Sequence, residues 1–465
     1  MTSSKALPRS TPAEQGVDSR GILAFLDAAD SAGIDHHSLM LVKNGHVVAE
    51  GWWSPYSSDR IHLLYSLSKS FTATAIGIAI GEGLLTLDDP VTSFFPDQLP
   101  VDVPPRVAAM QVRHLLAMAS GHKDDTIHSL FTGGPDLVAT FLSIEPDSDP
   151  GTLFCYNQGC TMTLSAIITS LTGEKLVDYL RPRLFDPLGI VQAHWLELPG
   201  GINQGFSGLH AETESIAKLG QLHLQGGKWD GRQLVPESFV AEARQFHVDN
   251  SPTSENPDWQ QGYGFQFWMC RHGAFRGDGA FGQFLVIVPD SDALIVVTAE
   301  NPDMQVQADL FWEHLLPALS ASATPDPETD KRLVERLGTL STATIDAPGA
   351  GPAEAVTFAR TGEFDDRLAD LSSLRVEPTA GGTRVVLVRD DGAETAVDLR
   401  AGAWTDGEVP DVARLLPPVA STGGWTDDKT FAADLVFVTS PHRLRIRAQA
   451  GATPTFEATW AAPPL

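Results

Sequence analysis

The sequence predicts an α+β fold: an antiparallel sheet flanked by helices, a helical insertion, and a C-terminal all-β domain built as a barrel or sandwich. Three observations support this prediction. An Asn-Gly pair at 44–45 separates two β-rich runs, which is the pattern of a tight hairpin. The run over 63–81 is almost wholly small and apolar, as in a helix buried on all sides. Segment 442–447 alternates basic and apolar residues with the period of a strand.

The composition fits an ordinary globular protein. With 465 residues the chain is long enough for two or three domains, and it is 42% hydrophobic and 20% charged. A formal net charge of −27 argues against partners such as nucleic acid or an anionic membrane surface. Three cysteines at these spacings fit neither a disulfide framework nor a zinc site. Residues 1–8 lack the apolar core of a signal peptide and no run reaches transmembrane length, so we expect a cytoplasmic protein.

The first half of the chain supplies one part of the sheet and then the insertion. We expect a helix over 21–32, the hairpin strands at 38–43 and 46–53, and the buried helix that follows Ser66. The insertion runs from about 84 to 235 and reads as mostly helical. Its helices are expected at 107–118, 161–171, 177–184 and 213–226.

After residue 260 the pattern returns to strands, so the sheet is completed by segments distant in sequence. Strands are expected near 262–268, 283–288 and 294–298, followed by an amphipathic helix over 305–319. A Pro- and Ser-containing stretch at 321–327 has the composition of a linker. We therefore place a first domain at 1–325, a linker at 326–344 and the all-β domain at 345–465.

Ser66 and Lys69 open the buried helix and lie three residues apart, on one face of its first turn. Burial at a helix start lowers the pKa of a lysine, and a serine there is close to free backbone N–H groups. The pair therefore has the properties of an activated nucleophile and its base. The alternative is that Ser66 only caps the helix and that Lys69 is exposed to solvent, since residues 66–69 are compatible with this arrangement too.

Two further segments could complete a catalytic site. Tyr156, flanked by turn-forming polar residues in the insertion, could project over Ser66 and exchange protons there, its pKa lowered by the lysine. The glycine-rich stretch 276–283 precedes a β-rich strand and would let a ligand lie against the backbone, where an N–H could join that of Ser66 in an oxyanion hole. Both segments also have a purely structural interpretation. Tyr156 could be a buried core residue, and the glycine-rich stretch could be a hairpin turn that binds no ligand.

Together, Ser66-x-x-Lys69, Tyr156-Asn157-Gln158 and Gly277-Asp278-Gly279 resemble the three motifs of the penicillin-recognising serine hydrolases. Their order and spacing are most similar to the class C β-lactamase branch, which includes family VIII carboxylesterases, D-aminopeptidases and 6-aminohexanoate-dimer hydrolase. The resemblance covers residues 10–320. It implies a β-lactamase/transpeptidase-like fold.

The resemblance also implies roles for the motif residues. Ser66 would be the nucleophile, and Lys69 and Tyr156 would share the general base and acid work, with the base left open because the two titrate as a pair. The N–H groups of Ser66 and Ala280 would hold the oxyanion. Substrate contacts would fall to the remaining motif positions, which are Gln158, Asp278 and Gly279. No metal or organic cofactor is implied.

Two motif positions depart from the family pattern. Gln158 stands where the family usually has asparagine, which moves the amide outward by one methylene. Gly277 stands where a lysine or histidine usually engages the carboxylate of β-lactams, and Asp278 follows it. We therefore expect weak binding of anionic β-lactams, while Asp278 either attracts a cationic amine or turns outward.

The sequence thus favours a serine hydrolase that cleaves a small ester or amide, rather than a true β-lactamase. The alternatives are a D-amino-acid peptidase or amidase of the same fold, and a catalytically silent binding or sensor protein. A Ser-His-Asp enzyme is disfavoured because no Gly-x-Ser-x-Gly elbow is present, which gives the histidines structural roles. Homo-oligomerisation is left open, as is whether the β domain covers the cleft, mediates self-association or only stabilises the fold.

Overall fold

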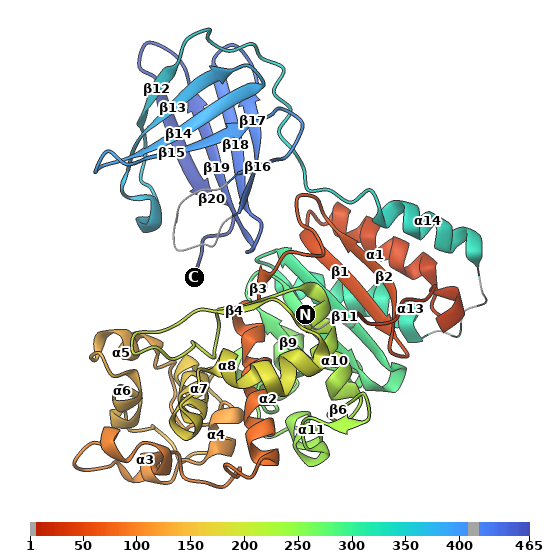
Figure 1. The fold of residues 1–465 in the computed structure, drawn as a ribbon, viewed down its shortest axis with the longest axis vertical. Helices are drawn as coiled ribbons and strands as arrows, with labels where there is room; N and C mark the ends of the chain where they lie inside the picture. Colours follow the sequence, from red (N-terminus) through yellow and green to blue (C-terminus); the bar gives the residue numbers. More distant parts are fainter. Residues whose placement is uncertain (1–5, 321, 323, 325, 408–417) are drawn as a thin grey trace.

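The computed structural model describes residues 6–320, 322, 324, 326–407 and 418–465, and it has an α+β part followed by a C-terminal β domain (Figure 1). Residues 1–5 of the N-terminal segment, and Ala321, Ala323 and Pro325 in the stretch with the composition of a linker, lie outside the described residues. Among the described helices, none combines the length and the apolar composition needed to cross a bilayer.

The α+β part is built on a six-stranded antiparallel sheet with the order β2-β1-β11-β10-β9-β8. Its strands are β1 (Asp35–Lys43), β2 (His46–Trp52), β8 (Trp268–Met269), β9 (Phe275–Gly279), β10 (Gln283–Val288) and β11 (Ala293–Glu300). Asn44 and Gly45 have φ of 50° and 73°, the left-handed values of a type I′ turn, so the predicted hairpin is confirmed. The sheet begins with an N-terminal hairpin and is completed after the insertion, as the sequence predicts.

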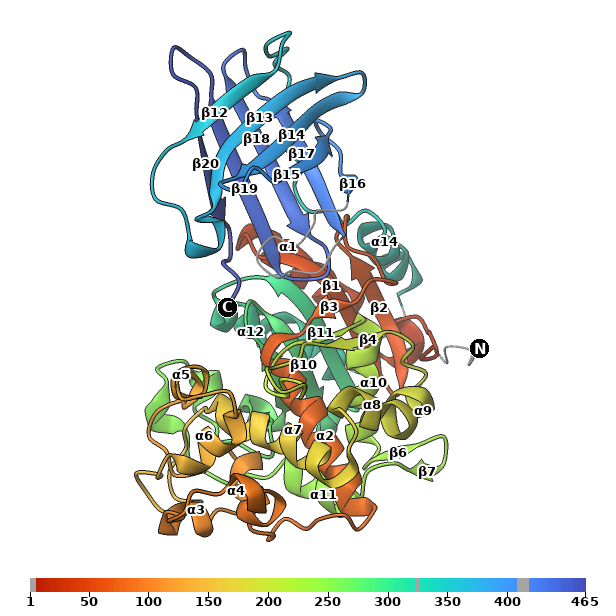
Figure 2. The same ribbon diagram turned by 60° about the vertical axis from the view of Figure 1, so that its left-hand side comes forward.

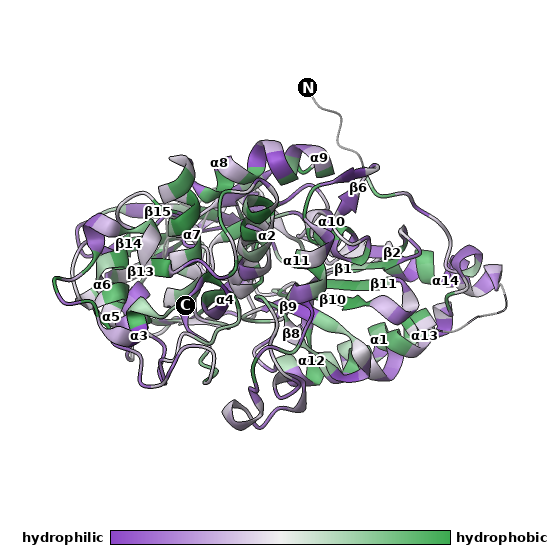
Figure 3. Ribbon diagram, turned by 90° about the horizontal axis from the view of Figure 1, so that it is seen from below, coloured by the Kyte–Doolittle hydropathy of each residue, from purple (hydrophilic) through white to green (hydrophobic). Residues whose placement is uncertain are grey.

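Helices cover both faces of the sheet, so alternate residues of each strand pack into two different hydrophobic clusters. In β10, Leu285 and Ile287 join one hydrophobic cluster while Phe284 and Val286 join the other. Figure 3 shows β10 and β11 mainly in the hydrophobic colour. The first cluster is covered by α2 (Ser68–Gly81) and α10 (Thr213–Leu224). The second is covered by α1 (Ser19–Ser31) and a C-terminal helical run of α12 (Met304–Leu310), the π-turn η10 (Phe311–Leu315) and α13 (Leu316–Ser320).

The insertion is mostly helical, as predicted, and lies beside α2 (Figure 2). Its helices are α3 (Pro105–Ala108), α4 (Val112–Leu116), α5 (Ile127–Thr132), α6 (Leu137–Ser143), α7 (Gln158–Thr172), α8 (Leu176–Leu180) and α9 (Asp186–Leu188), followed by α10 and α11 (Glu237–Ala243). Short strands are β3 (His62–Leu63), β4 (Ala193–Trp195), β5 (Leu209–Ala211), β6 (Lys228–Trp229) and β7 (Arg232–Gln233).

Two sequence predictions fail here for local reasons. The single helix expected over 107–118 is split, because Gln111 and His114 form a capping box that starts a new helix at Val112. The strand expected over 262–268 is mostly irregular, since Gly262 and Gln266 take φ of 99° and 59°, which a strand does not allow. Only Trp268 of that segment belongs to a strand, β8.

The C-terminal domain is a single nine-stranded sheet that curls until its ends, β15 and the β16–β17 pair, come into contact. Its strands are β12 (Val356–Arg360), β13 (Leu371–Thr379), β14 (Gly382–Arg389), β15 (Glu394–Leu399), β16 (Thr405–Gly407), β17 (Val419–Trp425), β18 (Thr430–Phe437), β19 (His442–Gln449) and β20 (Thr455–Trp460). All neighbours are antiparallel except β12 and β20. The interior is filled by apolar side chains, so the domain is a nearly closed barrel with its own core.

The β domain is docked directly on the α+β part. Tyr56 joins a small apolar cluster with side chains of β17, β18 and the residue after β18. Arg443 of β19 pairs with Asp35 at the start of β1, and its Nε lies 3.5 Å from an oxygen of Glu300 at the end of β11. Helix α14 (Pro327–Leu337), within the predicted linker, packs on α1 and β2 and buries Leu333 in the core beneath them.

Candidate active site

Ser66 lies in a one-turn 3₁₀ helix, η2 (Tyr65–Leu67), that leads directly into α2. Helix α2 is buried from Ser68 to Ala79, which confirms the helix without a polar face that the sequence predicts. Because Ser66 is in the first turn of this helical run, its N–H has no acceptor within the helix. Its side chain is half-buried and lines a cleft. The serine is therefore accessible although the helix behind it is not.

Lys69 is 1% exposed and its ammonium nitrogen faces Ser66. Its Nζ lies 3.1 Å from the Ser66 Oγ, 2.7 Å from Oε1 of Gln158 and 2.8 Å from the carbonyl oxygen of Phe206. Burial lowers the pKa of Lys69 to about 7, against the opposing attraction of the Asp125 and Asp278 carboxylates. A large fraction of Lys69 is therefore neutral near pH 7, as the sequence-based argument expects.

Tyr156 comes from the insertion, two residues before α7, whose N-cap is Asn157. The Lys69 Nζ lies 4.6 Å from the centre of the Tyr156 ring, and the Trp268 ring is stacked on the Tyr156 ring with centres 5.2 Å apart. Burial, reinforced by the Asp278 carboxylate, raises the pKa of Tyr156 above its usual range, although a hydrogen bond with Ser66 opposes the rise. The expected fall in this pKa is wrong, because desolvation of the phenolate outweighs a lysine that is only partly charged.

Gln158 is turned toward Lys69. Its Oε1 accepts the hydrogen bond from Nζ, and its backbone N–H donates to the Asp125 carboxylate at 2.9 Å. The side chain is not among those that line the cleft. A substrate contact by Gln158 stays a prediction, and its position is that of a residue that orients the lysine.

The third motif is itself a strand, β9, and not the loop before one. Gly279 at its end lies against the turn that carries Ser66: a Cβ added to Gly279 would be 2.0 Å from the carbonyl oxygen of Leu64. Only glycine permits this approach between two backbones. Ala280 follows it, in the turn closed by the Gly282 N–H on the Gly279 carbonyl, and lines the same cleft as Ser66. Ser66 and Ala280, whose N–H groups are predicted to form the oxyanion hole, thus line one cleft, and their role as oxyanion donors stays a prediction.

Asp278 points inward, and a cation that the sequence analysis missed neutralises it. The Arg276 Nε donates to Asp278 at 3.0 Å, and the guanidinium lies 4.3 Å from the centre of the Trp259 ring. Arg276 is 1% exposed, so its charge is held behind the cleft while Asp278 lines it. Residues 276 and 278 share one face of a strand, and this period-two spacing is the signal that could have identified the pair.

The cleft has a volume of about 770 Å³ and joins these elements. Aromatic side chains form much of its wall, and the residues that line it are Ser66, Phe154, Tyr156, Thr253, Ser254, Asn256, Trp259, Trp268, Asp278, Ala280, Pro302, Asp303 and Met304. Two of these aromatic residues are tryptophans, Trp259 and Trp268, whereas Trp53 is in the core. A space of this size fits a small organic substrate.

The histidines that the sequence analysis regards as structural lie outside the residues that line the cleft. They bond to nearby groups: His62 to the Leu63 carbonyl, His114 to the Gln111 N–H, His122 to Ser120 and the Ile144 carbonyl, and His210 to the Gly208 carbonyl. Burial lowers the pKa of His62 to about 3 and that of His210 to about 4. They have no contact with Ser66 that would support a Ser-His pair.

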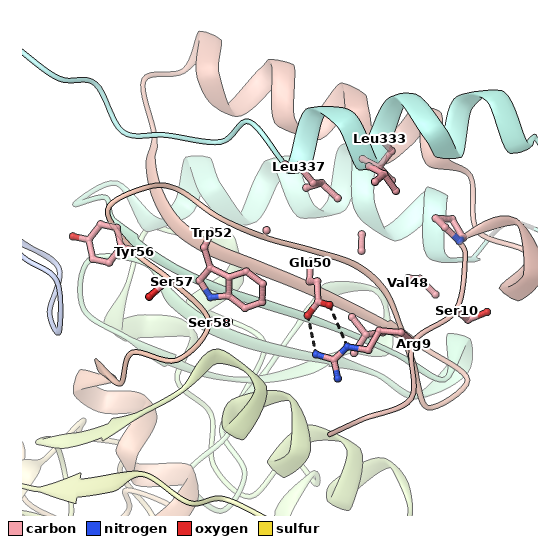
Figure 4. A pocket seen from close by; sticks show the side chains of 16 residues that line it. Arg9, Ser10, Val48, Glu50, Trp52, Tyr56, Ser57, Ser58, Leu333 and Leu337 are labelled. Atoms are coloured by element: carbon pink, nitrogen blue, oxygen red, sulfur yellow. Dashed lines mark hydrogen bonds and ion pairs between the residues drawn. The ribbon is translucent and has the colours of Figure 1, made fainter. Parts of the chain in front are cut away.

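A second depression, of about 590 Å³, lies between β2 and α14 (Figure 4). Leu333 and Leu337 reach into it from α14, and Trp52 lines it from β2. Its arginine, Arg9, is paired with Glu50 at 2.9 Å. It holds none of the residues predicted for the site, and among the described residues no group of three or more His, Cys, Asp or Glu side chains could hold a metal ion.

Comparison with known proteins places this geometry in context. The beta-lactamase family profile matches residues 27–316. The 6-aminohexanoate-dimer hydrolase of Paenarthrobacter ureafaciens is 26% identical over 289 residues, which are 57% of this chain and 73% of that protein.

Two solved structures share the fold. A family VIII carboxylesterase has a TM-score of 0.52 and 14% identity, covering 66% of this chain and 98% of its own. The octameric penicillin-binding protein homologue from Pyrococcus abyssi has a TM-score of 0.52 and 14% identity, and it covers 93% of this chain and 96% of its own. This second likeness therefore extends into the C-terminal β domain.

Proposed function

The chain belongs to the beta-lactamase family, and on that basis we propose that it is a serine hydrolase that cleaves a small ester or amide through an acyl-enzyme on Ser66. In this proposal Lys69 is the general base, Tyr156 is a neutral proton donor, and the N–H groups of Ser66 and Ala280 bind the oxyanion. The observation that carries it is the set of contacts around the Lys69 nitrogen.

A neutral lysine amine has two N–H donors and one lone pair. Two of the three neighbours of the Lys69 Nζ, the Gln158 Oε1 and the Phe206 carbonyl, are acceptors and take both N–H groups. The lone pair is then left for the third neighbour, the Ser66 hydroxyl at 3.1 Å. The pKa of about 7 makes this neutral form available near neutral pH.

Acylation then proceeds as follows. The Ser66 Oγ attacks the substrate carbonyl as its proton moves to Lys69, and the negative charge that develops on the carbonyl oxygen is held by the two N–H groups. Tyr156, whose raised pKa keeps its phenol protonated, donates a proton to the leaving alkoxide or amine and is reprotonated from Lys69. Water then attacks the acyl-enzyme, and the proton transfers run in the reverse order. This step releases the carboxylic acid and restores Ser66.

The charge of the cleft favours neutral substrates over anionic ones. Asp278 and Asp303 line it, and the Arg276 charge is already engaged behind Asp278. A β-lactam carboxylate would meet the Asp303 carboxylate, and no lysine, arginine or histidine is among the described residues that line the cleft to balance its charge, so binding of an anion is disfavoured. We therefore expect hydrolysis of p-nitrophenyl esters, and a kcat/KM for nitrocefin that is lower than the kcat/KM for these esters by at least about 100-fold.

A panel of p-nitrophenyl esters, D-amino-acid anilides and nitrocefin measures this preference. Asp303→Asn is the matched variant, since asparagine also caps α12 and only the charge is removed. It is expected to raise nitrocefin turnover while leaving ester turnover unchanged. Efficient cleavage of nitrocefin by the natural protein would contradict the proposal, and preference for the D-amino-acid anilides would favour the D-aminopeptidase alternative. Homo-oligomerisation stays a prediction.

A further inference from the structure

The β domain contacts the segment that leads to Ser66. The Leu63 N–H of β3 donates to the Thr439 carbonyl at 2.7 Å, in the turn between β18 and β19. On its other side, the next residue, Leu64, donates its N–H to the Leu209 carbonyl at 2.8 Å. The chain entering the nucleophile turn is therefore held between β5 and the C-terminal domain.

One hydrogen bond across this interface ends on the residue before Ser66. The Tyr65 hydroxyl lies 2.6 Å from Nε2 of His442, and Nδ1 of His442 lies 2.8 Å from the Ala462 carbonyl oxygen. Since a carbonyl only accepts, Nδ1 carries the imidazole proton and Nε2 accepts from the Tyr65 hydroxyl. Burial lowers the pKa of His442 to about 4 and raises that of Tyr65 to about 12, so the neutral forms that make this bond persist across the neutral range.

The same histidine contacts the residue after Ala280. The Phe281 and His442 rings meet edge to face with centres 5.4 Å apart, and the Tyr65 ring lies 5.5 Å from Phe281 and 5.7 Å from His442. Tyr65, Phe281 and His442 thus form a three-ring cluster in which each ring touches the other two. Two of its members are the immediate neighbours of the residues proposed to donate to the oxyanion.

Both of these neighbours have strained backbones. Tyr65 and Phe281 take φ of 48° and 66°, in the left-handed region that bulky residues rarely occupy. Such conformations persist where surrounding contacts determine them, and they concentrate at functional sites. The Tyr65 backbone sets the direction of the Ser66 N–H, and Phe281 completes the turn that presents the Ala280 N–H.

We infer that His442 of the β domain is a positioning residue that holds Tyr65 and Phe281, and through them the two oxyanion N–H groups, in their reactive geometry. This inference rests on the proposed function. It gives the C-terminal domain a role in the chemistry of the neighbouring domain: without the cluster, both strained turns keep their backbone hydrogen bonds but lose the ring contacts that fix Tyr65 and Phe281. No contact between His442 and the substrate is required.

The variant that tests it is His442→Phe, which keeps a ring and removes the acceptor for Tyr65. Active sites are counted with a p-nitrophenyl phosphonate, and kcat is expressed per counted site, so that loss of folded protein does not lower it. We expect kcat on a p-nitrophenyl ester to fall about 10- to 100-fold with KM unchanged, because oxyanion contacts act in the transition state. Binding of an alkylboronic acid, which forms a tetrahedral adduct on the serine, should weaken in proportion.

Two further variants provide a second test of the cluster and a control. Tyr65→Phe removes one oxygen from the same hydrogen bond and should lower kcat in the same direction, and combining it with His442→Phe should give less than the product of the two effects. Asp406→Asn breaks the Arg60–Asp406 ion pair, another contact between the two domains, without touching the cluster, and should leave kcat per site unchanged.

Equal kcat per site and equal boronate affinity in the natural protein and both cluster variants would overturn the inference while leaving the proposed function intact. A natural protein that reacts with no phosphonate and turns over no ester would overturn both.

Discussion

Replacing Lys69 with methionine is expected to lower kcat/KM for a p-nitrophenyl ester by about 10³- to 10⁴-fold, the upper part of the range for a positioned general base. Methionine has similar length and no lone pair on a nitrogen, so the Ser66 proton has no acceptor at the 3.1 Å position that Nζ occupies. Because Tyr156 keeps its proton through the neutral range, it does not replace the lysine as base. The rate is measured with the unfolding midpoint of the variant beside it.

Lys218 supplies the matched control. It is also a buried lysine, 3% exposed and paired with Glu214 at 3.6 Å, and it is on α10, away from the cleft. Lys218→Met should therefore lower stability without a comparable loss of kcat per active site. Near-normal turnover by folded Lys69→Met protein would show that another group accepts the serine proton.

Placing alanine at Gly279 is expected to lower kcat by about 10²- to 10³-fold, the effect of losing one oxyanion donor. The added Cβ would lie 2.0 Å from the Leu64 carbonyl oxygen, and backbone cannot yield as a flexible side chain does. Strand β9 must then move away from the Ser66 turn, and the Ala280 N–H no longer points at the oxyanion. Since this contact is made in the transition state, we expect the loss in kcat rather than in KM.

The control is Gly381→Ala in the β domain, where an added Cβ meets no atom within 4 Å and φ is not in the left-handed region. It measures the general effect of the substitution on stability and should leave kcat unchanged. If Gly279→Ala keeps normal kcat per active site, the close approach of β9 to Leu64 does not set the oxyanion geometry.

The sequence predicts most of the architecture because its signals are local and strong. The Asn44-Gly45 turn, the apolar run of α2 and the Gly173 end of α7, which takes φ of 73°, each depend on a few adjacent residues. The helix over 305–319 is likewise present, although a π-turn interrupts its hydrogen bonding at Phe311–Leu315. These elements fix the sheet and the helices that cover it.

The sequence predicts only part of the candidate site, because contacts between residues distant in sequence cannot be read from local patterns. The spacing of Ser66 and Lys69 within one turn is a local property, so their proximity follows from the helix. The hydrogen bond from Tyr65 to His442 joins residues 377 positions apart in the sequence, so their proximity depends on the folded chain. The direction of the Tyr156 pKa shift fails for the same reason, since it depends on how deeply the phenol is buried.

The central claim is that a neutral Lys69 makes Ser66 the reactive nucleophile. It is tested most directly by following the rate at which a fluorophosphonate labels the Ser66 peptide, identified by mass spectrometry, as the pH is varied. A base must lose its proton to act, and burial places the pKa of Lys69 at about 7, so labelling should be slow below that pH, rise through it and level off above it. Labelling of another residue, or a Ser66 rate that does not change between about pH 5 and 9, would contradict the claim.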